Sequence, residues 1–438
     1  MSRFESSGSG RRAPSTGARR LAAVPLALAV LVASIVIGPS VAAAPVAPAP
    51  LPTAQINGVA FAQVVVGNTV YVGGSFSTAR PAGSASGKRT VVRRNLLAYD
   101  LRTGRLTGWA PRTDGVVQAL AVSADRRTVF AVGAFTKVNG HARLRIAAIS
   151  RAGGVRAAFH PALNAVATAV AVHGSTVYVG GRFTRAAGAA RRFAAAFSAD
   201  GGALRRWRPQ PDGAVLALVV SPTGGSVVLG GRFGRVNGRV ATGTARVGSK
   251  LGTKNLRWQV NRVVGNHGAD SAVFSLSSSH GFVYGTGYSY GSSVPHRLEG
   301  AFAATWRTGA VHWIEDCHGD SYSVARAGST VYVVGHAHDC STIGGFDQSR
   351  PETWHRALAF TQDATRKVAK NTVKGYSDFR GQPAPTLLSA RPDFDTGTAT
   401  GQGQGPWSVV TSGAWVLYAG EFRHVDGTAQ QGLVRVRG

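Results

Sequence analysis

The chain has 438 residues and a formal net charge of +29 at pH 7, and Arg is far more frequent than Lys. Such a charge favours anionic partners such as uronic or teichoic polymers, phospholipid headgroups or nucleic acid, although an Arg-, Ala- and Gly-rich composition also arises from the codon bias of a GC-rich genome. No run of Lys and Arg is long enough to form a nucleic-acid-binding arm, and no second long apolar segment follows the N-terminal one.

The N-terminal segment predicts export. Arginines precede an apolar run over residues 21–37, and small residues follow up to Ala42. This order is typical of a secretory signal peptide spanning residues 1–42, and the alternative is an uncleaved membrane anchor. Removing five Arg and one Glu with this segment lowers the net charge to about +25. We therefore expect a secreted protein that has no membrane span after cleavage and no nucleic-acid partner.

Residues 43–52 are rich in Pro and Ala and predict a short extended linker. After the linker, a seven-residue motif occurs in seven copies, most often at intervals of 48 to 59 residues. We call it the glycine motif. Its copies are VYVGGSF (70–76), VFAVGAF (129–135), VYVGGRF (177–183), VVLGGRF (227–233), FVYGTGY (282–288), VYVVGHA (331–337) and VLYAGEF (416–422). The second glycine is clear in six copies, as Gly74, Gly133, Gly181, Gly231, Gly335 and Gly420.

Each copy belongs to a larger unit with alternating apolar and polar residues. A turn residue and a strand precede the glycine motif, and two further strands follow it, the last one ending in an aromatic residue such as Trp109 or Trp207. Four short strands per repeat, separated by Gly, Asn or Asp turns, predict the blades of a β-propeller. We expect an all-β, seven-bladed propeller with four-stranded blades over residues 53–438, with an insertion at about 345–405.

The last copy has only three strands before the chain ends. Because a propeller ring has to close, we expect the segment around residues 52–56 to supply the fourth strand of the last blade. A recurring glycine inside a strand indicates a β-bulge or the close approach of a neighbouring blade. We therefore expect the motif to be architectural, and any special site to lie where the motif decays, around His336 and Cys340.

The glycine motif, the Trp-x-Pro sequences followed by Asp-Gly, and the export signal together resemble the exported, actinobacterial-type β-propeller proteins with delta-sixty-like repeats. The resemblance covers nearly the whole mature chain and implies a fold and an exported location, but no chemistry. Two cysteines in an exported chain are more often paired than free. Members of this family often carry a Cys-x-Gly-Asp sequence before the motif and a second Cys after it, which supports a disulfide between Cys317 and Cys340. Ala337 departs from the family's Phe.

A second, distant resemblance is to quinoprotein-like propellers. The segment AYDLRTGRLTGW (98–109) is similar to their tryptophan-docking sequence, with one extra residue. It predicts that Trp109 docks on the next blade. The segment occurs clearly once and those enzymes have eight blades, so we expect no quinone cofactor.

Three groups of residues are candidates for function. The first group contains turn carboxylates that could converge on the propeller axis and bind a hard cation such as Ca²⁺, although Asp is also simply a favourable turn former. These are Asp114, Asp212, Asp270 and Asp320. The second group consists of histidines near carboxylates in the fifth and sixth copies, which could bind a metal or a ligand or could be solvated loop residues. These are His267, His318, His336 and His338.

The third group is an aromatic binding loop formed by Trp354, Tyr376 and Trp407, which lie among Arg and Lys residues. Aromatic rings among cations suit stacking on a carbohydrate, although such an excursion can also pack on its own blade. No motif of a hydrolase, metalloprotease or nucleotide-binding site occurs. We expect a monomeric, non-catalytic protein without a resident cofactor that binds a cell-wall or extracellular anionic polymer or a protein. The alternative is a polysaccharide hydrolase or lyase with an axial His/Asp site.

Overall fold

Short antiparallel strands account for nearly all of the regular structure. The structure is a computed structural model that describes residues 49–279, 281–290 and 295–438, all within one unit that spans 44–438. The predicted signal peptide lies outside the described residues. In the described residues, no helix has the length and apolar character needed to span a bilayer. The two helices in these ranges are single 3₁₀ turns, η1 (Val260–Arg262) and η2 (Ser341–Ile343).

Seven main sheets are formed within the described ranges, one for each copy of the glycine motif, and we number them in chain order. Sheets 1 and 2 contain β2 (Val59–Val66), β3 (Thr69–Ser75) and β6 (Leu96–Asp100), and β7 (Val117–Val122), β8 (Thr128–Gly133) and β11 (Ile146–Ser150). Sheets 3 and 4 contain β12 (Ala167–His173), β13 (Thr176–Gly181) and β16 (Ala194–Ser198), and β17 (Val215–Val220), β18 (Ser226–Gly231) and β21 (Thr244–Gly248).

Sheets 5 and 6 have four strands each. They contain β22 (Ser271–Ser279), β23 (Phe282–Ser289), β24 (Gly300–Thr305) and β25 (Val311–Glu315), and β26 (Ser321–Ala327), β27 (Thr330–Ala337), β28 (His355–Thr361) and β31 (Leu387–Ser389). Sheet 7 contains β32 (Pro406–Ser412), β33 (Trp415–Gly420) and β36 (Leu433–Arg437). The stretch 345–405, expected as an insertion, thus supplies the third and fourth strands of sheet 6.

Short hairpins at the sheet ends make up the remaining strands. One small sheet joins β1 (Gln55–Ile56), β4 (Thr78–Arg80) and β5 (Val91–Val92). The two-stranded hairpins are β9 (Lys137–Val138) with β10 (His141–Ala142), β14 (Arg185–Ala186) with β15 (Ala189–Ala190), β19 (Arg235–Val236) with β20 (Arg239–Val240), β29 (Arg366–Lys367) with β30 (Pro383–Ala384), and β34 (His424–Val425) with β35 (Thr428–Ala429).

The fourth strand expected in every repeat is complete only in sheets 5 and 6. In sheets 1 to 4 it is reduced to a single bridge to the third strand, at Leu106, Val155, Leu204 and Asn255. The chain then leaves the sheet and places an aromatic side chain against it. Trp109 lies edge-on to Tyr71 of sheet 1 at 4.9 Å between ring centroids, and its Nε1 donates to the carbonyl oxygen of Ser150 in sheet 2 at 3.0 Å. The predicted docking of Trp109 on the next sheet is confirmed.

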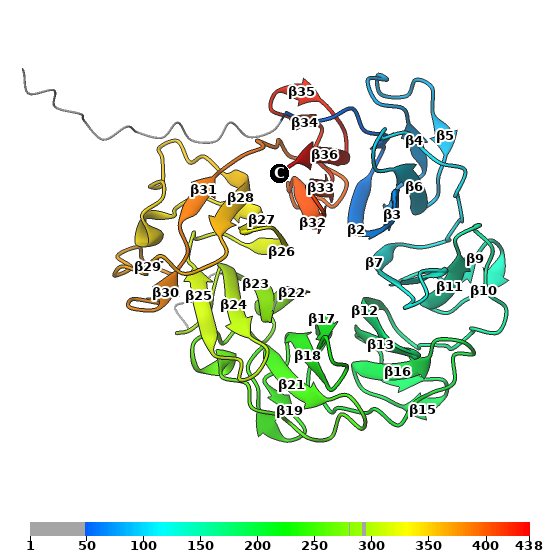
Figure 1. Cartoon of the computed structure of the whole chain (residues 1–438), viewed down its shortest axis with the longest axis horizontal. Coiled ribbons are helices and arrows are strands. Elements are labelled where there is room, and N and C mark those ends of the chain that lie inside the picture. Colours follow the sequence, from blue (N-terminus) through cyan, green and yellow to red (C-terminus); the bar gives the residue numbers. More distant parts are fainter. Residues whose placement is uncertain (1–48, 280, 291–294) are drawn as a thin grey trace, which may run out of the picture. The chain divides into compact units, whose positions relative to one another are not determined.

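The sheets are arranged around a common centre, and the first strand of each sheet is the innermost one (Figure 1). Each first strand contacts the first strand of the next sheet, from β2 and β7 through to β26 and β32, and β32 also contacts β2. The apolar core lies mainly between neighbouring sheets, for example where Val117 and Leu120 of sheet 2 pack with Leu96 of sheet 1. The first strand of each sheet is thus the strand that borders the centre.

The two glycines of the motif have different roles. A Cβ at the first one, Gly73, would overlap Val117 of the next sheet, so this glycine allows neighbouring sheets to approach closely. A Cβ at the second one, Gly74, would overlap the carbonyl oxygen of Val59 in its own sheet. That second contact arises because β2 bulges between Ala60 and Ala62, directly opposite the glycines.

Candidate ligand-binding site

Every first strand carries a β-bulge at the same place. In each sheet the strand register skips one residue opposite the glycine motif, between Ala60 and Ala62 in β2 and at the corresponding places in the other six first strands. A bulge turns a side chain out of the regular alternation of a strand. The seven skipped residues, which we call the bulge residues, are Phe61, Gln118, Thr168, Leu216, Phe274, Tyr322 and Trp407.

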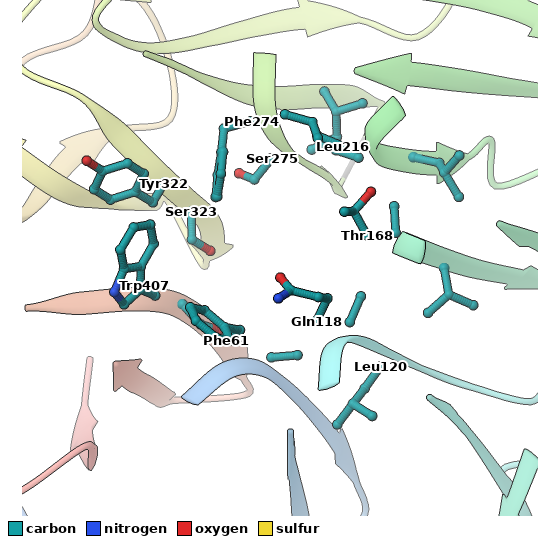
Figure 2. A pocket seen from close by; sticks show the side chains of 18 of the residues that line it. Phe61, Gln118, Leu120, Thr168, Leu216, Phe274, Ser275, Tyr322, Ser323 and Trp407 are labelled. Carbon is teal, nitrogen blue, oxygen red and sulfur yellow. The ribbon is translucent and has the colours of Figure 1, made fainter. Parts of the chain in front are cut away.

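All seven bulge residues line one central cavity with a volume of about 340 Å³ (Figure 2). Four of them are aromatic and form one continuous wall. In this aromatic wall Tyr322 and Trp407 lie 4.4 Å apart between ring centroids, Phe61 lies 5.9 Å from Trp407, and Phe274 lies 5.5 Å from Tyr322. The other three, Gln118, Thr168 and Leu216, add an amide, a hydroxyl and an aliphatic group to the lining. The cavity is therefore chemically asymmetric.

The residue between the second glycine and the aromatic position of the motif varies from sheet to sheet. In chain order it is Ser75, Ala134, Arg182, Arg232, Tyr288, His336 and Glu421. Tyr288 belongs here because the strand register of sheet 5 pairs Gly287 with Val273, so Gly287 is the second glycine of that sheet. Ser75, Arg182, Arg232 and Tyr288 line a hollow of about 440 Å³. This hollow shares eight of its residues with the central cavity, namely Phe61, Gln118, Arg182, Arg232, Phe274, Tyr288, Tyr322 and Trp407. We call this hollow the mouth. The motif is thus not purely architectural, because one of its seven positions contributes to the lining of the mouth.

Two guanidinium groups stand at the mouth without a carboxylate partner. Arg182 is exposed, and its guanidinium group forms no hydrogen bond or ion pair with any described residue, while its backbone N–H donates to the carbonyl oxygen of Val166 at 2.9 Å. The guanidinium carbon of Arg232 lies 5.7 Å from the centroid of the Tyr288 ring, and one Nη donates to the carbonyl oxygen of Ala269 at 2.6 Å. Together they make this side of the mouth positive, whereas the aromatic wall lies on sheets 5, 6, 7 and 1.

Glu421 holds part of the mouth in place. Its carboxylate is 2% exposed and accepts hydrogen bonds from Nε1 of Trp407 at 3.0 Å and from the backbone N–H of Thr400 at 2.8 Å, as well as from the Thr400 hydroxyl. Thr400 belongs to a glycine-rich loop, and residues 399, 400 and 402 of that loop line the mouth. One buried carboxylate therefore positions both the largest ring of the aromatic wall and the adjacent loop.

The predicted axial carboxylates mostly act in turns. Asp114 accepts backbone N–H bonds from Thr136 and Lys137 at 2.7 and 2.8 Å, and Asp212 accepts those of Gly234 and Arg235 at 2.9 and 3.0 Å. Asn57 and Asn164 make the same bonds in sheets 1 and 3. Hydrogen bonds hold the pKa of Asp114 below its ordinary value, although its partial burial acts in the opposite direction. Asp270 is exposed.

The strand register corrects the predicted equivalence of Asp320 with these turn residues. In sheets 1 to 5 the turn residue lies three positions before the residue paired with the second glycine, as Asp114 does before Val117. In sheet 6 Ser321 pairs with Gly335, so His318 occupies the turn position. Asp320 is instead buried, and it accepts bonds from the Ser289 N–H at 3.2 Å and the Tyr322 hydroxyl at 3.4 Å. Burial raises its pKa to about 6.

His318 is enclosed beside the disulfide bond, and the predicted pairing of Cys317 with Cys340 is confirmed. The imidazole is fully buried and stacks on Tyr376 at 4.0 Å. Its Nε2 lies 3.8 Å from Asp316 and its Nδ1 3.9 Å from Asp339. Burial lowers its pKa to about 4 and raises that of Asp316 to about 7.

The other predicted histidines have local partners. His336 lies within 3.2 Å of the Gln404 side-chain oxygen and 3.4 Å of the Tyr322 hydroxyl, and burial lowers its pKa to about 4. His338 contacts the Tyr376 hydroxyl at 3.0 Å and Glu352 at 3.4 Å. Nδ1 of His267 lies 2.7 Å from the carbonyl oxygen of Gly265. In the described part of the chain, no three His, Cys, Asp or Glu residues are placed so that they could hold a metal ion.

The three residues of the predicted binding loop are placed in different environments. Trp354 is 40% exposed and lies 5.6 Å from the Arg356 guanidinium. Tyr376 covers His318, and Trp407 belongs to the aromatic wall of the central cavity. The structure therefore brings Trp407 together with Phe61, Phe274 and Tyr322, whose contribution to the cavity was not predicted. In sheets 1 to 5 a signal for the bulge position exists in the sequence, because the bulge residue follows the turn residue by four positions, as Gln118 follows Asp114 and Phe274 follows Asp270.

Comparisons with known proteins support the fold. The chain is similar to U3-55K, with a TM-score of 0.52 and 11% sequence identity, over 89% of this chain and 100% of that one. It is also similar to the β-propeller domain of Cps50 (Swd1) from Myceliophteria thermophila, with a TM-score of 0.49, 8% identity and coverage of 88% and 99%. No family model matches the chain, and no curated protein matches it. The described unit is a β-propeller, and likeness at this identity shows the fold alone.

Proposed function

We propose that this chain is an exported, non-catalytic, seven-bladed β-propeller that binds an acidic sugar unit of a cell-surface or extracellular glycan in its central cavity. The observation that carries this proposal is the set of bulge residues. Seven strands from seven sheets each direct one side chain into the same cavity. In four neighbouring sheets this residue is a large aromatic ring, and the four rings pack in one apolar cluster with Val59 while they also line the cavity.

The geometry of the termini supports closure by the N-terminal segment. The backbone N–H of Leu51 donates to the carbonyl oxygen of Arg435 at 2.9 Å, so the N-terminal segment pairs with β36. The Arg435 guanidinium donates to the carbonyl oxygens of Pro52 and Leu101 at 2.7 and 3.0 Å. This single bridge corresponds to the reduced fourth strand of sheets 1 to 4, although it lies at Leu51 rather than within 52–56.

The lining chemistry suits a sugar ring that carries an anionic group. Aromatic side chains offer flat faces on which the apolar face of a pyranose stacks, and guanidinium groups bind carboxylate or phosphate through paired hydrogen bonds. The aromatic wall supplies the first element, Arg182 and Arg232 supply the second, and Gln118 adds a neutral donor and acceptor. A volume of about 340 Å³ lies within the range of small-ligand sites.

The hydrolase or lyase alternative depends on the histidines and carboxylates of sheet 6. Asp320 and His336 bond to Tyr322, whose ring forms part of the cavity wall, and His318 is covered by Tyr376. The side chains that do line the cavity are aromatic, aliphatic, hydroxyl, amide and guanidinium groups. These groups are suited to stacking and hydrogen bonding, which favours binding over turnover.

The test is calorimetric titration of the protein lacking residues 1–42 with short acidic and neutral oligosaccharides. We expect Trp407→Ala to weaken binding of the acidic sugar at least tenfold, since a stacking contact contributes about 1–2 kcal/mol and an empty wall admits water. Gln118→Trp, which fills the cavity from the side opposite the aromatic wall, should block binding even if the first variant is unstable. Trp354→Ala is the matched control, because that ring lies outside the cavity and should leave affinity unchanged.

The double variant Arg182→Ala/Arg232→Ala should remove the preference for acidic over neutral sugars, whereas Arg206→Ala, an exposed arginine away from the mouth, should keep it. Equal binding by the native chain, Trp407→Ala and Gln118→Trp would refute the site. Chromatography of the oligosaccharide after incubation tests catalysis, and release of shortened or unsaturated products would show that the protein is an enzyme.

A further inference from the structure

The net positive charge of residues 49–438 comes entirely from one part of the sequence. Residues 49–262, which form sheets 1 to 4, contain thirty Lys or Arg and five Asp or Glu, a net charge of +25. Residues 263–438, which form sheets 5 to 7, contain fourteen of each and have no net charge. A codon bias acts on the whole gene and does not separate charge between two parts of one chain. The asymmetry therefore calls for a physical explanation.

The cations of sheets 1 to 4 are not neutralised within the protein. No Lys or Arg of residues 49–262 forms an ion pair with a described carboxylate, and the ion pairs found all join residues between His312 and Asp426. The five carboxylates of this part accept hydrogen bonds from nearby turns instead, as Asp100 does from Arg102 and Thr103. Uncompensated like charges repel one another and destabilise a fold, so this arrangement has a cost in stability that a bound polyanion would offset.

The cations nearest to the mouth recur at two positions of the repeat. The position after the second glycine is Arg182 in sheet 3 and Arg232 in sheet 4, and both line the mouth. Three residues further on, the chain carries Lys137, Arg185 and Arg235 in sheets 2, 3 and 4, all of them exposed. Their backbone N–H groups bond to Asp114, Asn164 and Asp212, which are the turn residues just before the first strands. These cations therefore lie at the same end of the sheets as the mouth.

The same two positions change character on the other side. The residues equivalent to Arg182 are His336 and Glu421 in sheets 6 and 7, and those equivalent to Lys137 are Asp339 and His424. In sheet 2, Lys137 joins Arg94 and Arg112 around a hollow of about 520 Å³. We call Arg112, Lys137, Arg182, Arg185, Arg232 and Arg235 the basic rim. Arg182 and Arg232 line the mouth itself, and the other four cations lie at the same end of sheets 2 to 4. The positions equivalent to Arg182 and Lys137 carry no Lys or Arg in sheets 6 and 7.

We propose that the basic rim binds the continuing chain of a linear polyanionic glycan whose end unit occupies the central cavity. This inference rests on the proposed function and specifies its ligand as a polymer with repeated carboxylate or phosphate groups. The polymer leaves the mouth over sheets 2 to 4, because the two equivalent positions of sheets 6 and 7 carry neither Lys nor Arg. Binding beyond the first unit is mainly electrostatic, so it weakens as salt displaces the polymer from the rim.

The test compares a short ligand with a polymer on one protein. The triple variant Lys137→Ala/Arg185→Ala/Arg235→Ala leaves the cavity lining intact, so its affinity for a short acidic oligosaccharide should be unchanged. Its affinity for polygalacturonate or poly(glycerol phosphate) should fall at least tenfold, and the slope of log affinity against log salt should fall by about two. The two polymers distinguish a carboxylate from a phosphodiester ligand. The matched control is Lys367→Ala/Lys370→Ala/Lys374→Ala, which removes three exposed cations of the neutral part.

Equal losses in the rim variant and the control variant would overturn the proposal, as would an unchanged salt slope in the rim variant. Single-stranded DNA of matched charge that binds as tightly as both glycans would overturn the assignment to a glycan. If the polymer advantage is missing while the short oligosaccharide still binds, the rim proposal fails and the cavity proposal stands. If Gln118→Trp blocks neither ligand, the cavity proposal fails as well.

Discussion

The buried carboxyl groups of sheets 5 and 6 predict an unusual dependence of stability on pH. Glu315 is 1% exposed, and burial, together with the neighbouring Asp316, raises its pKa to about 8 from an ordinary value of 4.5. Between these two values the side chain is neutral in the folded protein and ionised in the unfolded chain. The folded state therefore binds one more proton, and the free energy of unfolding falls as pH rises through this window.

The size of the effect follows from linkage. One such group changes stability by about 1.4 kcal/mol per pH unit at most, so a group with a folded pKa near 8 costs about 2 kcal/mol between pH 6.5 and 8.5. Burial raises the pKa of Glu299 to about 8 as well, which adds a similar amount. His318 and His336, whose pKa values burial lowers to about 4, act in the opposite direction, but only below their ordinary value of 6.5. The range from 6.5 to 8.5 therefore isolates the carboxyl groups.

The assay is urea unfolding followed by tryptophan fluorescence at pH 6.5, 7.5 and 8.5. We expect the native chain to lose several kcal/mol across this range, and Glu315→Gln to remove about 2 kcal/mol of that loss. Asp347→Asn, at an exposed carboxylate, is the control and should follow the native chain. A native chain with a flat or rising stability profile, or a Glu315→Gln variant with the native slope, would refute the reasoning.

Three further predictions concern stability at neutral pH, each measured by the same unfolding assay. Gly133→Ala should lower the free energy of unfolding by about 3 kcal/mol or more, because the added Cβ would overlap the Val116 carbonyl oxygen. Gly108→Ala is the control and should be nearly neutral, since no atom lies near that position. Equal losses in the two variants would contradict the close packing at the bulge. Replacing both Cys317 and Cys340 by Ser should cost about 3 kcal/mol, as expected for a bridge over a sequence separation of 23, and an unchanged midpoint would show that the bridge does not restrict the unfolded chain. Glu421→Leu should lower the free energy of unfolding by about 3 kcal/mol, because it leaves Trp407 Nε1 and the Thr400 N–H without an acceptor. Glu421→Gln keeps a side-chain oxygen acceptor and should therefore lose less stability. Equal losses in the two variants would refute the role of the carboxylate.

The repeated pattern of the sequence was sufficient to predict the first three strands of each repeat and most of the turns, whereas the disulfide bond was predicted from the two cysteines of an exported chain and from the family resemblance. Alternating apolar residues, Gly and Asp turns, and a recurring glycine are local properties, since each reflects what a few neighbouring residues of one strand or turn require. For the same reason the docking of Trp109 could be predicted, because a turn followed by a large ring is a local motif with one stable packing arrangement. The presence of His318 at the turn position of sheet 6 could not be predicted, because Asp320 lies two residues further on and is the residue type expected at such a turn.

The sequence by itself determined that the unit repeats, and it predicted that the recurring glycines mark a bulge or a close approach and that Cys317 pairs with Cys340, both of which the structure confirms. Only the tertiary structure decided which side chains meet. A bulge shifts one residue out of the regular alternation of the strand, and a side chain such as Phe61 or Trp407 then lines the central cavity instead of pointing to one face of its sheet. Their proximity depends on the arrangement of whole sheets around a centre, which relates residues more than three hundred positions apart. The four-residue offset from a turn residue marks the bulge position in sheets 1 to 5, but no local pattern shows that these side chains meet, so the cavity became visible only when the sheets were assembled.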